Sequence, residues 1–252
     1  MRRFLLSGAV ALIATGVLAT PAAANHAWGN YHWARTANPF TLKVGDNVTS
    51  TWDAHLDLAI SDWHQSSVLD LQDVAGTAKN KQCRPTSGRI EVCNGSYGFN
   101  GWLGVATIWL QGSHITQATT KVNDSYFSTA AYNAPQKRQH VMCQEVGHDF
   151  GLGHQDESGA DLGTCMDYDR NLDNQHPDAH DYQQLELIYA HLDGFNSYTG
   201  TESAGLAASD DAKPDKVERT DRIHSSTIEE HFHDGSKRVT HVTWAFEGPG
   251  RP

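Results

Sequence analysis

Residues 144–154 of the chain read QEVGHDFGLGH, and residues 165–168 read CMDY. If the first stretch is helical, Gln144 and His148 are four residues apart and project from one face, with Glu145 one position round from that face. Gly151 lets the chain leave the helix through backbone dihedrals that are closed to other residues, so His154 turns back toward His148. This pattern predicts several ligands gathered around one metal ion.

The two stretches resemble the metzincin zinc peptidases, whose signature is H-E-x-x-H-x-x-G-x-x-H followed by a Met-turn. The matching residues are Glu145, His148, Gly151, His154 and Met166. The resemblance implies an α+β, metzincin-like zincin domain. In that fold, helices back a twisted mixed sheet, and the active-site helix is followed by the Met-turn, which provides an apolar floor beneath the metal.

The resemblance also implies roles for individual side chains. Gln144, His148 and His154 would hold Zn²⁺, and Glu145 would be the general base that takes a proton from a metal-activated water. Tyr168 stands where astacin-like and serralysin-like members use a tyrosine to stabilise the oxyanion; an ordinary turn tyrosine is the alternative. The expected function is that of a secreted zinc metalloendopeptidase that hydrolyses peptide bonds.

Gln144 stands where the family has its first zinc-ligand histidine, and three alternatives follow. An amide oxygen is a neutral and harder donor than imidazole, so it would bind zinc less tightly and give a slower enzyme. A water or another histidine could take its place, but not His140, which lies about 12 Å from His148 along a helix axis. Otherwise the site holds no metal, and the chain is a catalytically inactive peptide-binding module with the same fold.

Residues 101–110, GWLGVATIWL, form the most apolar stretch after the N-terminal region and predict a strand. This stretch is similar to the segment that metzincins place just before the zinc helix, where an edge strand lies alongside the substrate. The resemblance implies that the backbone near residues 103–107 binds an extended peptide as a further strand. The expected partner is therefore an extended peptide or protein substrate.

The N-terminal residues predict export. Arg2 and Arg3 precede an apolar run that extends to about Leu18, and alanines at 22–24 suit a signal peptidase. Residues 1–24 are therefore interpreted as a signal peptide and the protein as secreted. The formal net charge of −11 argues against phosphate backbones and anionic membranes as partners, and we expect a monomer without nucleic-acid or membrane partners.

The four cysteines suit an oxidising compartment. Of the three possible pairings we favour Cys83 with Cys93 and Cys143 with Cys165. The second bond would join the motif helix to the Met-turn and would stabilise the fold by about 3 kcal/mol in the chain-entropy model. A metal-binding thiolate at Cys143 or Cys165 is the less favoured alternative, because an exported thiol is usually oxidised.

The remaining patterns predict a domain over residues 25–195. Strands are expected at residues 40–44 and 68–71, and helices at about 50–63, 135–150 and 178–194, whereas residues 83–93 are expected to form a loop or hairpin. Residues 196–252 are interpreted as a linker, 196–222, followed by a hairpin with its turn at Asp234-Gly235. His231, His233 and His241 in this hairpin are expected to be solvated rather than metal-binding.

Overall fold

The computed structural model describes residues 26–79, 81–168, 171–199 and 212–246. The predicted signal peptide, residues 1–24, lies outside these residues. Among the described residues, no helix has the length and apolar character that crossing a bilayer requires.

The core of the fold is one nine-stranded mixed sheet with the order β3-β2-β4-β6-β5-β9-β8-β7. Strands β2, β3, β4 and β6 pair in parallel, whereas β6 and β5, β5 and β9, β9 and β8, and β8 and β7 pair antiparallel. The short strand β1 pairs in parallel with the first residues of β6. The bounds are β1 (His32–Trp33), β2 (Phe40–Asn47), β3 (Leu69–Ala75), β4 (Arg89–Gly95), β5 (Trp102–Gln111), β6 (His114–Asn123), β7 (Lys216–Asp221), β8 (Ser225–His231) and β9 (Ser236–Trp244).

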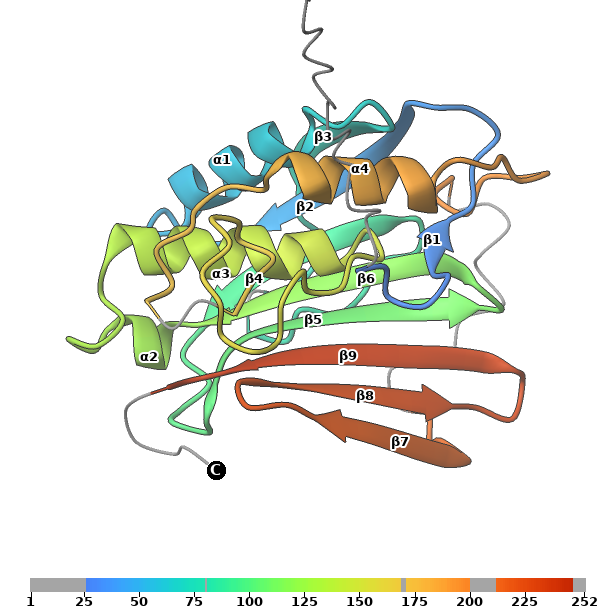
Figure 1. Cartoon of the computed structure of the whole chain (residues 1–252). Coiled ribbons are helices and arrows are strands. Elements are labelled where there is room, and N and C mark those ends of the chain that lie inside the picture. The colour runs from blue at the N-terminus through green and yellow to red at the C-terminus, as the bar shows by residue number, and fades with distance from the viewer. Residues whose placement is uncertain (1–25, 80, 169–170, 200–211, 247–252) are drawn as a thin grey trace, which may run out of the picture.

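The three longer helices lie on one face of this sheet (Figure 1). The helices are α1 (Asp53–Trp63), α2 (Asp124–Phe127), α3 (Pro135–His148) and α4 (Ala179–Ile188). Buried tryptophans fix the end of α3: Trp63 Nε1 donates to the Cys143 carbonyl at 3.0 Å, and Trp33 Nε1 donates to the Asp149 carbonyl at 2.9 Å. The predicted α+β fold, a mixed sheet backed by helices, is confirmed.

Most predicted elements are present, with differences at their ends. Helix α4 begins after Asp178, whose side chain forms a capping box with Asp181, but the helix ends at Ile188 rather than near Gly194. The segment expected as a loop or hairpin between Cys83 and Cys93 instead includes the first residues of the largely buried strand β4, from Arg89 onward. Both favoured disulfides, Cys83–Cys93 and Cys143–Cys165, are confirmed.

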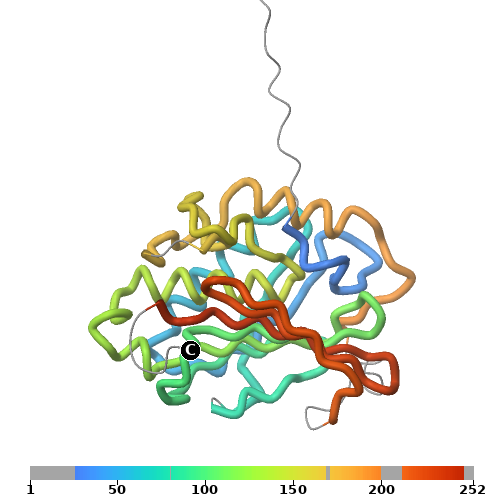
Figure 2. Tube along the Cα trace, turned by 60° about the horizontal axis from the view of Figure 1, so that its bottom comes forward, coloured from blue at the N-terminus to red at the C-terminus, as the bar shows by residue number. Residues whose placement is uncertain are grey.

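The C-terminal residues differ most from the prediction. Residues 216–221, expected in the linker, form strand β7, and the hairpin does turn at Asp234-Gly235. Its strands are not a solvated extension, because β9 pairs with β5 over Trp102–Gln111 and joins the main sheet. Figure 2 shows the three C-terminal strands, in red, side by side, and the strand order places them at one end of the sheet with β7 outermost. The prediction that the edge of β5 is free to bind a peptide is therefore wrong for this conformation, since β9 occupies that edge.

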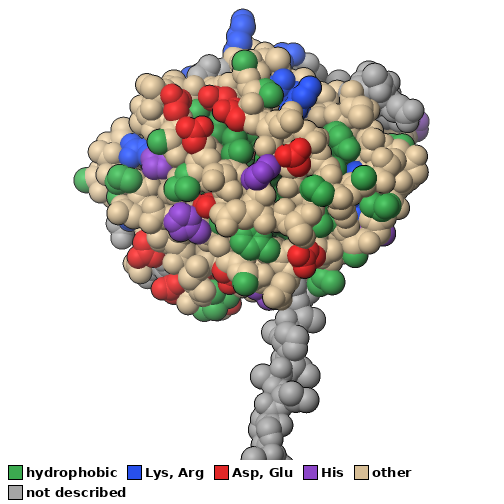
Figure 3. All heavy atoms as spheres, turned by 90° about the horizontal axis from the view of Figure 1, so that it is seen from above, with side chains coloured by type: hydrophobic (Ala, Val, Ile, Leu, Met, Phe, Trp, Pro, Cys, Tyr) green, Lys and Arg blue, Asp and Glu red, His purple; other side chains and the backbone are tan. Residues whose placement is uncertain are grey.

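The face above α1 and α4 carries acidic side chains scattered among apolar and uncharged groups (Figure 3). Side chains of one kind are not concentrated in a single patch there. The motif residues instead lie beneath this surface, between α3 and the sheet, where Gln144, Glu145 and His148 are all buried.

Candidate metal centre

Helix α3 carries the motif and packs tightly against the turn that contains Met166. A Cβ atom added at Gly147 would lie 2.7 Å from Met166 Sδ and 2.7 Å from Trp63 Cζ2. The neighbours of Gly147 are thus side chains, which leave no room for a methyl group at this position. The disulfide between Cys143 and Cys165 ties the same helix to the same turn.

The chain leaves α3 through Gly151, whose φ is +91°. An added Cβ there would lie 2.2 Å from the Tyr31 carbonyl oxygen. The N-terminal segment holds the bend, because Trp28 N–H donates to the Gly151 carbonyl at 2.7 Å and Gly153 N–H donates to the His26 carbonyl. The bend returns the chain toward α3 and brings His154 Nε2 to 3.1 Å from His148 Nε2.

Gly151→Ala is expected to lower the free energy of unfolding by about 3 kcal/mol, since a positive φ and a backbone clash oppose the new methyl group. Urea unfolding followed by circular dichroism measures the change. The matched control is Gly194→Ala, because a Cβ added at Gly194 meets no atom within 4 Å. Its free energy of unfolding should change by no more than about 0.5 kcal/mol. If the two substitutions lowered the free energy of unfolding equally, the positive φ and the close backbone contact at Gly151 would not be what makes this position sensitive.

Three histidines converge at the end of this bend. His148, His154 and His241 each offer a ring nitrogen, and these nitrogens all lie within 4.8 Å of one another. The ring centroid of His241 is 4.1 Å from that of His148 and 4.7 Å from that of His154. His241 comes from β9, next to β5, and is buried. It was expected to be solvated, and that expectation is wrong.

The surroundings of the cluster keep its imidazoles neutral. His148 Nδ1 donates to the Leu152 carbonyl at 2.8 Å, which leaves the lone pair on Nε2, the atom that faces His154. Burial lowers the pKa of His148 to about 3 and that of His241 to about 3, and it holds the pKa of His154 well below its usual value. Neutral imidazole is the form that binds a metal ion.

Glu145 is fully buried beside the cluster. Its Oε2 lies 3.5 Å from His241 Nδ1, and its Oε1 has no hydrogen-bond partner among the described residues. Burial raises the pKa of Glu145 to about 7, although nearby His148 opposes this rise. A Cβ added at Gly104 of β5 would lie 2.5 Å from Oε1, so only glycine leaves room for the carboxylate there.

Gln144 uses its amide for other contacts. Nε2 donates to the carbonyls of Cys165 and Asp167 at 3.0 and 2.9 Å, and Oε1 accepts from Thr243 Oγ1 at 2.9 Å. These bonds join α3 to the Met166 turn and to β9. The structure therefore brings His148, His154 and Glu145 together as expected from the motif, but it adds His241 where Gln144 was expected to contribute.

Tyr168 also contacts the cluster. Its hydroxyl lies 3.0 Å from His241 Nε2, and its ring centroid is 3.9 Å from that of His154. Burial raises the pKa of Tyr168 well above its usual value, so the hydroxyl stays protonated. The indole of Trp28 packs against His148 and His241 and covers this side of the cluster.

The donor set fits zinc. Imidazole nitrogen is a preferred zinc donor, and donors bound to one tetrahedral ion at about 2.0–2.1 Å lie roughly 3.3 Å apart. The nitrogens of His148 and His154 are 3.1 Å apart, and the unpaired Glu145 oxygen lies in a buried position where an uncompensated carboxylate is costly. A bound cation beside Glu145 would offset that cost.

Comparisons with known proteins give weak similarities. No family model matches the chain, and no curated protein matches it. Among solved structures, myroilysin is similar over 62% of this chain and 82% of its own, with 13% identity and a TM-score of 0.37. High choriolytic enzyme 1, a hatching enzyme zinc-protease from the medaka fish Oryzias latipes, is similar over 63% of this chain and 94% of its own, with 10% identity and a TM-score of 0.35. Similarities with identities and TM-scores this low do not assign a function to this chain.

Proposed function

We propose that this protein is a secreted zinc-dependent peptidase of the metzincin type, held in a closed state by its own C-terminal strand. The observation that carries the proposal is the convergence of His148, His154 and His241 beside the buried carboxylate of Glu145. The two disulfides suit an extracellular protein. The substrate would be an extended peptide or protein.

In the closed state, zinc would be held by His148, His154 and His241. When bound, the ion would lower the pKa of a coordinated water to about 7 and would polarise a peptide carbonyl. Glu145 would accept the proton of that water and pass it to the leaving amine, because its carboxylate is buried directly beside the histidine cluster. The Tyr168 hydroxyl would donate a hydrogen bond to the oxyanion once it is released from His241.

Strand β9 determines whether a substrate reaches the site. It fills the β5 edge along Trp102–Gln111, so an extended peptide cannot pair with β5 in the conformation described. If β9 leaves, His241 leaves with it, and Thr243 releases the Gln144 oxygen to which it donates. Gln144 would then be the third donor on the motif segment, as the sequence pattern suggests.

A second candidate is a zinc-binding protein that does not cleave peptides. The filled β5 edge favours it, because a permanently paired strand leaves no place for a substrate. The two candidates make the same prediction for zinc content and opposite predictions for cleavage after β9 is released.

Glu145→Gln tests the peptidase proposal. Zinc content, measured by mass spectrometry of the metal, is expected to be unchanged, because Glu145 is not a ligand. Casein cleavage by the opened protein is expected to fall about 100-fold, as for the loss of a general base. Zinc binding without any cleavage in the opened wild-type protein would instead favour the second candidate.

A further inference from the structure

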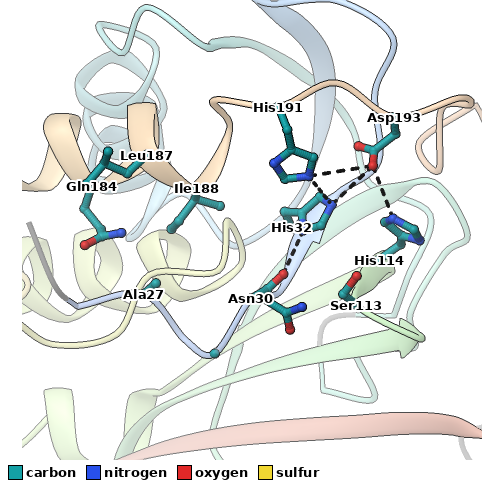
Figure 4. A pocket seen from close by; sticks show the side chains of 11 residues that line it. Ala27, Asn30, His32, Ser113, His114, Gln184, Leu187, Ile188, His191 and Asp193 are labelled. Carbon is teal, nitrogen blue, oxygen red and sulfur yellow. Dashed lines mark hydrogen bonds and ion pairs between the residues drawn. The ribbon is translucent and has the colours of Figure 1, made fainter.

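A second group of histidines lies at the end of the sheet where the β5–β6 hairpin turns. We propose that His32, His114, His191 and Asp193 form a zinc site separate from the centre at His148, with a structural role. Figure 4 shows the four side chains pointing toward one another at one side of a cavity of about 520 Å³. The inference stands on this cluster alone and does not depend on the peptidase proposal.

Three separate chain segments supply the four side chains. The parallel register of β1 and β6 places His32 directly beside His114. His191 and Asp193 follow the end of α4, and Asp193 N–H donates to the Arg35 carbonyl at 2.8 Å, which fixes this segment next to β1. The register of β1 with β6 and the position of the segment after α4 thus bring the four donors together.

The distances match those expected around one ion. Asp193 Oδ1 lies 3.5 Å from His32 Nε2, 3.3 Å from His114 Nε2 and 3.7 Å from His191 Nε2. The Nε2 atoms of His32 and His191 are 3.1 Å apart. Four donors at about 2.0–2.1 Å from a tetrahedral zinc ion would be roughly 3.3 Å apart, and three imidazoles with one carboxylate are donors that zinc accepts.

Neighbouring groups orient the donors. His32 Nδ1 donates to the Asn30 carbonyl at 2.7 Å, so its Nε2 carries the lone pair that faces the cluster. Asp193 Oδ2 accepts from Arg35 Nη1 at 2.8 Å and from Arg35 N–H at 3.1 Å, which leaves Oδ1 for the cluster. Burial tends to raise the pKa of Asp193, but the bond from Arg35 and the charges nearby hold it below its usual value.

Without a metal ion, His191 Nε2–H would donate to the lone pair on His32 Nε2, which is fixed as an acceptor by the bond from Nδ1 to Asn30. A zinc ion would replace that one proton and bind all four side chains. An ion could enter from solvent, because the His191 side chain is 53% exposed and that of His114 is 27% exposed. A site closed by four protein ligands is typical of structural zinc rather than catalytic zinc.

Another acidic and histidine group provides a matched control. Glu218, Glu229 and His231 also lie close together on β7 and β8, where Glu218 is exposed and the other two are partly exposed. Their carboxylates already pair with cations, Glu218 with Lys216 at 2.5 Å and Glu229 with Lys237 at 2.7 Å. We therefore assign no metal to this group.

The test isolates the proposed site in the full chain by combining His148→Ala with His154→Ala. This variant is expected to bind one equivalent of Zn²⁺, and Co²⁺ in its place should give the visible absorption of a four-coordinate site. Adding His114→Gln and His191→Gln should lower the affinity at least 100-fold, whereas adding His231→Ala should leave it unchanged. Circular dichroism of the metal-free proteins checks that each variant folds.

A second measurement covers the case in which the double variant does not fold. After dialysis against a weak chelator, the zinc-to-chain ratio of the exposed single variant His191→Gln should be lower than that of the wild-type protein by about one, whether or not the centre at His148 is occupied. Absence of binding in the folded double variant would overturn the proposal. A zinc-to-chain ratio that is the same in the wild-type protein and in His191→Gln would also overturn it.

Discussion

His241→Ala is expected to lower the zinc affinity of the centre at His148 and His154 by about 1000-fold. The change removes one of three converging imidazoles, and the expected loss exceeds the 10- to 100-fold that follows when an outer hydrogen-bond partner of a ligand is removed. Competition with a chelating indicator at neutral pH measures the affinity. The measurement is made in a His114→Gln, His191→Gln background, so that the second proposed site does not contribute.

Gln144→Met is the matched variant, since methionine has a similar volume but offers no amide. We expect the zinc affinity of the closed protein to change less than about threefold. The carbonyls of Cys165 and Asp167 would lose their donors, so the free energy of unfolding should fall by about 2 kcal/mol. If Gln144→Met instead abolishes binding and His241→Ala does not, the ligand set suggested by the motif is correct and His241 is a neighbour only.

The parts of the site that lie within one short segment could be predicted from the sequence. Helix α3, the bend at Gly151 and the proximity of His148 to His154 all follow from local spacing and from a glycine at a positive φ. The Cys143–Cys165 disulfide likewise joins two segments of the motif. Local geometry determines these features, so a pattern of residue types is sufficient to indicate them.

The contribution of His241 could not be predicted in the same way. It depends on the pairing of β9 with β5, which are more than a hundred residues apart in sequence, and many strands could have paired there. The alternation of Val239, His241 and Thr243 on one side of β9 was the only local sign that His241 faces inward. Strand β6 could not be predicted from its residue types either. Its buried residues include Thr119 and Thr120, so the segment lacks the continuous apolar run that indicates a buried strand.

Releasing β9 from β5 is expected to raise peptidase activity about 1000-fold over that of the intact chain. If opening the β5 edge costs about 4 kcal/mol, roughly one molecule in a thousand is accessible to substrate. Complete release of β9 makes every molecule accessible, so the activity should rise by about the same factor. A protease site introduced within residues 200–211, followed by cleavage and separation of residues 212–252, produces the open form. Casein hydrolysis at saturating zinc, before and after cleavage, measures the change.

Thr240→Pro gives a test that keeps the chain intact. Thr240 pairs with Thr107 of β5 and with Ile228 of β8, and a proline there removes a hydrogen bond of the ladder. If the substitution weakens the pairing with β5 by about 3 kcal/mol, the open fraction should rise about 100-fold. Val217→Pro is the control, because Val217 lies on the outermost strand β7 and its loss leaves the pairing of β5 with β9 in place. In the open form Gln144→Met should reduce cleavage, since the amide then replaces His241. If Thr240→Pro and the cleaved protein both bind zinc but never cleave casein, the chain is a zinc-binding protein without peptidase activity.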